Sequence, residues 1–187
     1  MVSLGALWLP VLLAAVLVFA VSALVWMVLP HHRKDFRGLA NEEDVRAVLD
    51  EGGVSPGQYT IPHAPDRETY REPEMQAKFE EGPNAFLTVL PSGTPSMGKQ
   101  FAQWFAYSVV VGVFCAYVAG RTLPPGADYL HVFRVTGTVA WLAYGFAYVQ
   151  EAIWFGRPWS FVWKQVLDAL LYGLVTAGAF GWLWPAM

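Results

Sequence analysis

Three ionisable residues lie inside long hydrophobic segments near the C-terminal end of the chain. Glu151 and Lys164 stand at equal distances from a short, turn-rich segment, residues 155–160. If that segment connects two antiparallel helices, both side chains reach the same depth in the membrane. Asp168 follows Lys164 by four residues and therefore shares a helix face with it. Charged groups in a membrane normally pair with one another or face water, so this group is a candidate site.

Two interpretations of this polar group are open. In the structural interpretation, Glu151, Arg157, Lys164 and Asp168 form an ion-pair cluster that holds the two helices together, with Lys164 extending towards the interface. In the alternative, Glu151, Lys164 and Asp168 begin an ion or proton path. No acidic residue continues such a path through the first or second hydrophobic segment, which favours the structural interpretation.

The sequence contains no pattern typical of a metal, haem or nucleotide site. None of His31, His32, His63 and His131 lies at the centre of a hydrophobic segment. Adjacent His31 and His32 are expected to point to different sides of a helix and to lie at the membrane interface. A single cysteine, Cys115, excludes a CxxC pair, and the GxGxxG and GxxxxGK[ST] motifs are absent. We therefore predict a non-enzymatic protein without catalytic residues, a metal site or an intrinsic cofactor.

Charge is concentrated in one internal segment. The chain of 187 residues is 55% hydrophobic and 14% charged, whereas a soluble domain carries about 25% charged residues. Residues 31–99 hold 8 of the 12 Lys and Arg residues and 12 of the 15 Asp and Glu residues. This division predicts a membrane-embedded part and one water-exposed insert. A net charge of -3 without a basic stripe argues against nucleic-acid binding.

The apolar segments predict an all-α membrane protein with four transmembrane helices. Residues 4–29 carry no charge and would form a helix of about 39 Å, enough to cross a hydrocarbon core of about 30 Å. We expect this segment to be an uncleaved first span within a domain at 1–30. The other three spans, at 101–119, 132–154 and 160–184, would form a three-helix membrane region at 100–187.

Positive charges near the span ends predict the orientation. Arg33, Lys34 and Arg37 follow the first span, and Lys99 and Arg157 flank later spans on the same side. An excess of Lys and Arg marks cytoplasmic segments. The insert, residues 31–99, is therefore expected in the cytoplasm and both termini in the periplasm, with the protein in the bacterial inner membrane.

The insert is predicted to hold one short helix at 41–51 followed by extended, Pro-rich chain. Asn41 and the acidic residues after it are typical of a helix start, and Gly52 with Gly53 ends the helix. Seven prolines lie between residues 56 and 95, and FLTVL at 86–90 indicates a short strand. Because the apolar residues are too few for an independent core, we expect them to contact another chain or this protein's own helix ends. The candidate contacts are Tyr59, Ile61, Phe79, Phe86, Leu87 and Val89.

Small residues recur every four positions in two of the predicted spans. This spacing allows close contact between membrane helices. The two predicted packing seams are Gly112, Ala116 and Gly120 in the second span, and Gly173, Ala177 and Gly181 in the fourth.

The segments MVSLGALWLPVLL, WMVLPHHRKDFRGL and AIWFGRPWS resemble those of an uncharacterised family of small multi-pass bacterial inner-membrane proteins. The resemblance covers the first span, the basic motif after it and a region near the fourth span. It implies a bacterial membrane location and brings no activity, cofactor or catalytic residue.

We expect this chain to be a non-catalytic accessory subunit of a larger membrane complex, with a photosynthetic or respiratory assembly as the natural host. Its partners would be other membrane-protein subunits and the lipid bilayer. Trp-rich membrane faces offer surfaces for bound lipid or pigment. A small transporter or channel is the alternative, although the internal repeats and broken helices typical of transporters are absent. A membrane enzyme acting on lipid or quinone is a third hypothesis, which is disfavoured because the sequence shows no group of residues suited to acid–base catalysis.

Overall fold

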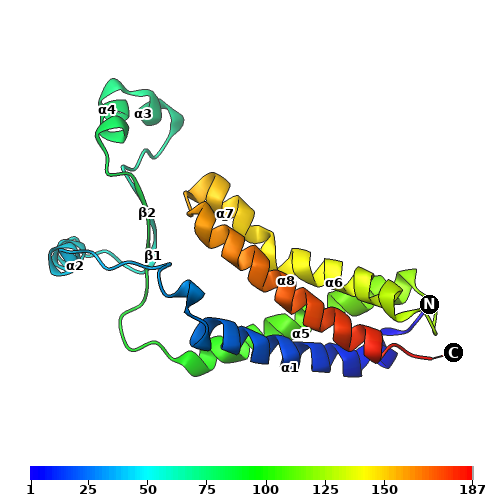
Figure 1. Ribbon diagram of the computed structural model, residues 1–187. Coiled ribbons are helices and arrows are strands. Elements are labelled where there is room, and N and C mark those ends of the chain that lie inside the picture. The colour runs from blue at the N-terminus through cyan, green and yellow to red at the C-terminus, as the bar shows by residue number, and fades with distance from the viewer. Residues whose placement is uncertain (187) are drawn as a thin grey trace. The chain divides into compact units, whose positions relative to one another are not determined.

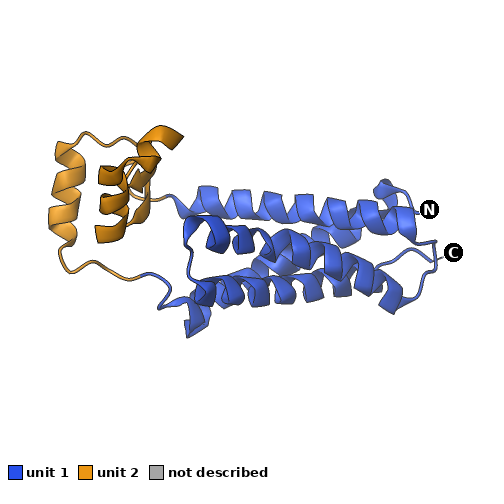
Figure 2. Cartoon of the chain, turned by 90° about the horizontal axis from the view of Figure 1, so that it is seen from above, with its two compact units in different colours: residues 1–36, 96–187 blue, residues 37–95 orange. Residues whose placement is uncertain are grey.

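Two compact units make up the chain in the computed structural model, which describes residues 1–186. The helical bundle contains residues 1–36 and the chain from residue 96 onward, and the polar unit contains residues 37–95 (Figure 2). The predicted insert began at residue 31, whereas residues 31–36 belong to the bundle. His31, His32 and Asp35 are therefore part of the bundle.

The bundle begins with a continuous helical segment of three parts. Leu4–Leu7 form a 3-10 turn, α1 covers Trp8–Ala23, and Leu24–Val28 form a π-helical turn. The Ser3 hydroxyl accepts a hydrogen bond from the backbone N–H of Ala6 at 3.3 Å and so caps the first turn. The inward face of α1 is buried against α5 and α8.

Four further helices complete the bundle: α5 (Met97–Thr122), α6 (Tyr129–Gly145), α7 (Ala147–Phe155) and α8 (Trp159–Trp182) (Figure 1). α8 packs against α6 and α1, and α5 contacts both α1 and α6. The segment predicted as one span at 132–154 is divided at Phe146. A Cβ added to Gly145 would lie 2.7 Å from Ala169 Cβ, so α6 approaches α8 very closely where it ends.

Two helices within residues 1–186 are long and apolar enough to cross a membrane. They are Leu4–Val28, with a mean hydropathy of 2.8, and Met97–Thr122, with 1.6. The prediction of four transmembrane helices is therefore wrong. The break at Phe146 leaves α6 with 17 residues and α7 with 9, and the first half of α8 carries Lys164, Gln165 and Asp168.

The apolar surface of the two candidate spans faces mainly outwards. Only 33% of the first apolar window and 28% of the second are buried inside the protein. The core helix of a water-soluble protein would bury most of such a surface. Both helices therefore present to their surroundings the apolar side chains that a lipid environment accommodates.

The small residues predicted as a seam on α5 lie at its contact with the N-terminal segment. A Cβ added to Gly112 would lie 3.2 Å from Val11 Cγ1, and one added to Gly120 would lie 2.8 Å from the carbonyl oxygen of Val2. Ala116, between them, is almost completely buried. These positions allow α1 and the chain before it to pack directly on the α5 backbone.

The corresponding positions on α8 contact α6. A Cβ added to Gly173 would lie 3.0 Å from the carbonyl oxygen of Gly137, and Ala177 is completely buried beside the same glycine. At Gly181 an added Cβ would lie 2.6 Å from the Tyr129 ring. Small residues on both helices therefore set the close α6–α8 approach.

The polar unit contains more regular structure than the sequence predicted. The expected short helix is present as α2 (Glu42–Glu51), but the chain after it forms β1 (Gly57–Ile61), α3 (Arg67–Arg71), α4 (Pro73–Glu81) and β2 (Ala85–Val89). The prediction of a largely irregular insert with one helix is therefore wrong. Proline was interpreted there as a breaker, whereas Pro73 occupies the first turn of α4, where its missing N–H costs nothing.

The two strands pair antiparallel, with Tyr59 opposite Leu87 and Ile61 opposite Ala85. Alternate residues of a strand point to opposite faces, so Tyr59, Ile61, Leu87 and Val89 share one face. None of residues 37–95, all of which the structure describes, is buried. The polar unit is thus held by local pairing and not by a hydrophobic core.

Candidate functional site

A cluster of polar side chains joins the chain after α1 to the middle of α8. The π-helical turn closes with a hydrogen bond from Leu29 N to Leu24 O at 3.1 Å. Leu29 is extended, and Pro30–His32 then form a 3-10 turn. Proline fixes its own backbone angle and disfavours helix in the residue before it. The sequence therefore turns the chain at Pro30, and the turn carries the two histidines to α8.

Both histidine rings contact the carboxylate of Asp168 on α8. Nε2 of His32 lies 2.6 Å from Asp168 Oδ2, and Nε2 of His31 lies 3.1 Å from Asp168 Oδ1. The expectation that adjacent histidines point to different sides is wrong here. In the turn after Pro30 the two ring centroids are only 4.0 Å apart.

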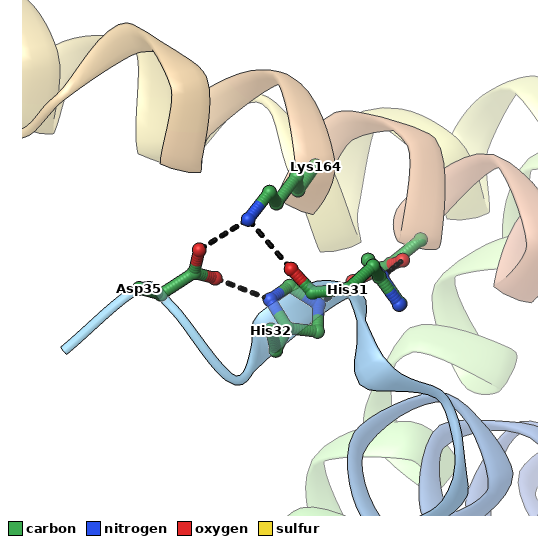
Figure 3. A network of polar contacts seen from close by, with 5 residues as sticks. His31, His32, Asp35 and Lys164 are labelled. Carbon is green, nitrogen blue, oxygen red and sulfur yellow. Dashed lines mark hydrogen bonds and ion pairs between the residues drawn. The ribbon is translucent and has the colours of Figure 1, made fainter.

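A second carboxylate holds the other side of the cluster (Figure 3). Asp35 Oδ2 lies 2.5 Å from His32 Nδ1, and Asp35 Oδ1 accepts a hydrogen bond from the Lys164 ammonium. Lys164 Nζ also donates to the backbone carbonyl of His31 at 2.6 Å. One lysine on α8 thus binds both the turn and its carboxylate.

The centre of the cluster is shielded from solvent, and its edge is open. The side chains of His32, Asp35 and Asp168 are 4–5% exposed, whereas those of His31 and Lys164 are 35% and 30% exposed. The Trp26 indole stacks on the His32 ring with centroids 3.9 Å apart and planes within 4°. The π-helical turn that contains Trp26 therefore also fixes the orientation of His32.

Charge balance explains how buried carboxylates are accommodated. Burial alone would raise the pKa of Asp35, but the hydrogen bonds and positive charge supplied by Lys164 and His32 outweigh it and lower the pKa below its ordinary 3.8. An ionised carboxylate only accepts hydrogen bonds. His32 has a carboxylate oxygen within hydrogen-bonding distance of each of its ring nitrogens. Lys164 and His32 thus surround the Asp35 carboxylate, and the two histidines contact that of Asp168.

The structure divides the four residues that the sequence grouped together. Arg157 Nη2 lies 3.8 Å from Glu151 Oε2 in a pair whose side chains are both more than 40% exposed. Lys164 and Asp168 instead contact the turn after α1, through Asp35 and the histidines. Of the three residues in the ion-path alternative, Glu151 therefore lies outside the cluster that contains Lys164 and Asp168.

Sequence reasoning missed Asp35 and the role of both histidines. The histidines precede the basic segment 33–37 and Asp35 lies within it. The positive charges of that segment predict only the orientation in the membrane. The available signal was Pro30 directly before His31 and His32, because proline changes the direction of the chain at that point. Their partners on α8 are more than 120 residues away.

The polar unit contains the six predicted contact residues. Tyr59, Ile61, Leu87 and Val89 share the apolar face of the β1–β2 hairpin, and Phe86 lies in the register of the opposite face. Phe79 on α4 packs against the Tyr70 ring, with centroids 5.3 Å apart. Four of the six thus form one continuous surface.

Comparison with known proteins assigns no relative to this chain. No protein-family model matches it, and no curated protein or solved structure is significantly similar to it. Functional inference therefore rests on the geometry described above.

Proposed function

We propose that this protein is a non-catalytic accessory subunit of a larger bacterial membrane complex, whose polar unit binds partner subunits. The bundle would lie in the inner membrane through its two apolar segments, Leu4–Val28 and Met97–Thr122. Arg33, Lys34 and Arg37 follow the first segment, and Lys99 lies at the start of the second. These charges favour a cytoplasmic polar unit.

The observation that carries the proposal is the absence of any buried residue between positions 37 and 95, all of them described. An isolated two-stranded hairpin is only marginally stable in water. Ile61 is nevertheless 49% exposed and Tyr59 37% exposed on the apolar face of the hairpin. A partner that covered this face would supply the burial that the unit lacks and would order it, as binding does for weakly folded segments.

The bundle offers a second surface to its surroundings. Trp159 and Trp163 stack with ring centroids 5.9 Å apart, and both are about half exposed. Tryptophan favours the membrane–water interface, where its ring is apolar and its N–H remains hydrated. This pair is suited to bound lipid or to a pigment of an associated subunit.

Extraction of a tagged protein from its native membranes in mild detergent tests the proposal. On native electrophoresis the protein should migrate in a large assembly, well above its own 20.7 kDa plus detergent. Deletion of residues 56–95 should release it from that assembly while the bundle stays in the membrane fraction.

A matched pair of variants locates the contact surface. Ile61→Asp with Leu87→Asp places charge on the apolar hairpin face and should release the partners. Gln58→Asp with Thr88→Asp adds the same charge to the opposite face of the same strands and should leave the assembly intact. Migration of the wild-type protein alone, or unchanged co-purification of partners with the deletion variant, would contradict the proposal.

A further inference from the structure

We propose that His31, His32 and Asp168 form a binding site for a divalent transition-metal ion of the zinc class. Each residue offers one ligand atom, and the three atoms lie within 4.8 Å of one another. Ligands around a tetrahedral zinc ion are separated by about 3.3 Å. His31 Nε2 lies 3.1 Å from Asp168 Oδ1 and His32 Nε2 lies 2.6 Å from Asp168 Oδ2, so the side chains would have to separate by several tenths of an ångström to admit an ion.

The surroundings of His32 are those of a metal-binding histidine. Such a ring normally donates its second N–H to a carboxylate, which fixes the tautomer and directs the other nitrogen at the metal. Asp35 occupies that position at 2.5 Å from Nδ1, and Trp26 stacks on the ring. Lys164 binds Asp35, so this outer carboxylate is neutralised and the negative charge of Asp168 remains for the ion.

The charge of the cluster also favours a cation. Without a metal, the two oxygens of the buried Asp168 carboxylate face Nε2 of His31 and Nε2 of His32. A divalent ion bound by the three residues would place positive charge directly at this carboxylate. The buried carboxylate would then exchange hydrogen bonds for a metal bond without losing its partner.

The donor set selects the class of metal. Two imidazoles and one carboxylate suit zinc and neighbouring transition ions, whereas magnesium and calcium prefer ligand sets made of oxygen. Three protein ligands leave one coordination position for water or for a residue of a partner. His31, at 35% side-chain exposure, lies at the open edge of the cluster, where an ion can enter.

A bound ion would connect the end of α1 to α8 at the point where the chain leaves the bundle. All residues of this site belong to the bundle, so metal binding needs neither the polar unit's partners nor any other protein.

Metal content of the purified full-length protein in detergent tests the inference. Protein stripped with a chelator, loaded with Zn²⁺ and passed through gel filtration should retain about one ion per chain. Loading with Co²⁺ should give the visible absorption of a low-symmetry nitrogen–oxygen site. Asp35→Asn should weaken Zn²⁺ affinity by roughly 10- to 100-fold, as loss of an outer-shell carboxylate does.

His31→Ala is the decisive variant because its partly exposed side chain can be removed with little disturbance of the fold. It should lose the retained Zn²⁺ and the Co²⁺ absorption while keeping the wild-type elution volume and helical circular dichroism. His131→Ala removes a histidine of similar chemistry whose side chain is 60% exposed, and it should retain both signals. Equal Zn²⁺ retention in the two variants, or none in the wild-type protein, would overturn the inference.

Discussion

His32 Nε2 lies 2.6 Å from Asp168 Oδ2, across 136 positions of the chain. This contact attaches the turn after α1 to α8 and creates a buried polar centre at the end of an apolar helix. Each oxygen of its two carboxylates, Asp35 and Asp168, has a nitrogen partner from a histidine or from Lys164.

Asp168→Asn should destabilise the bundle strongly. The substitution keeps the shape of the side chain but leaves His32 without one of its two carboxylates. Loss of one partner from a buried ion pair costs about 3 kcal/mol, and thermal or denaturant unfolding in detergent would measure it. Glu151→Gln removes an exposed pair with a 3.8 Å separation and should cost at most about 1 kcal/mol. Equal losses in the two variants would contradict the assignment of Asp168 to a buried network.

Lys164→Met should raise the pKa of Asp35. Because the folded-state pKa is lowered, the carboxylate contributes stability above its ordinary pKa of 3.8, and this contribution is lost as pH falls through the lower folded value. Without the lysine, only His32 opposes the effect of burial, so the pKa of Asp35 rises and the carboxyl group protonates at higher pH. A carbon-13 titration of labelled, chelator-treated protein would follow the group directly. An unchanged Asp35 titration would show that the lysine does not control it.

Gly173→Ala should destabilise the α6–α8 contact, because the added methyl group would lie 3.0 Å from the backbone carbonyl of Gly137. Overpacking of this kind costs about 1–3 kcal/mol. At Gly178, on the same helix, an added Cβ would contact only the Tyr129 hydroxyl, at 3.8 Å. Gly178→Ala should therefore be neutral or stabilising by up to about 1 kcal/mol. Unfolding measurements on the two variants separate close packing from a general effect of alanine.

A cysteine at position 92 should resist labelling from outside intact cells. Ser92 lies in the polar unit, for which we propose a cytoplasmic location. The native Cys115 is buried and contributes little background. Asp128→Cys, at a site whose side chain is 86% exposed between α5 and α6, should react with the same impermeant reagent. Both positions should react after lysis. Rapid labelling at position 92 alone in intact cells would reverse the orientation.

Local features were predictable because they depend on residues close together in the sequence. The uncharged segment 4–29 indicates a long apolar helix, and α1 with its flanking turns occupies that segment. The acidic start and double-glycine end of α2 are likewise local signals. Small residues at four-residue spacing indicate close packing on one helix face, whichever helix provides the partner.

The polar cluster was decided by tertiary structure. Lys164 and Asp168 share a helix face by their spacing alone, but their partners follow from the turn at Pro30 and from the approach of α1 to α8. The break at Phe146 directly follows Gly145, whose close approach to Ala169 is likewise a contact between distant parts of the chain. Hydropathy and helical periodicity therefore determined where apolar helices form. The contacts between buried polar groups were decided only when those helices packed. A buried charged group needs a partner at hydrogen-bonding distance, and that partner can come from any part of the chain.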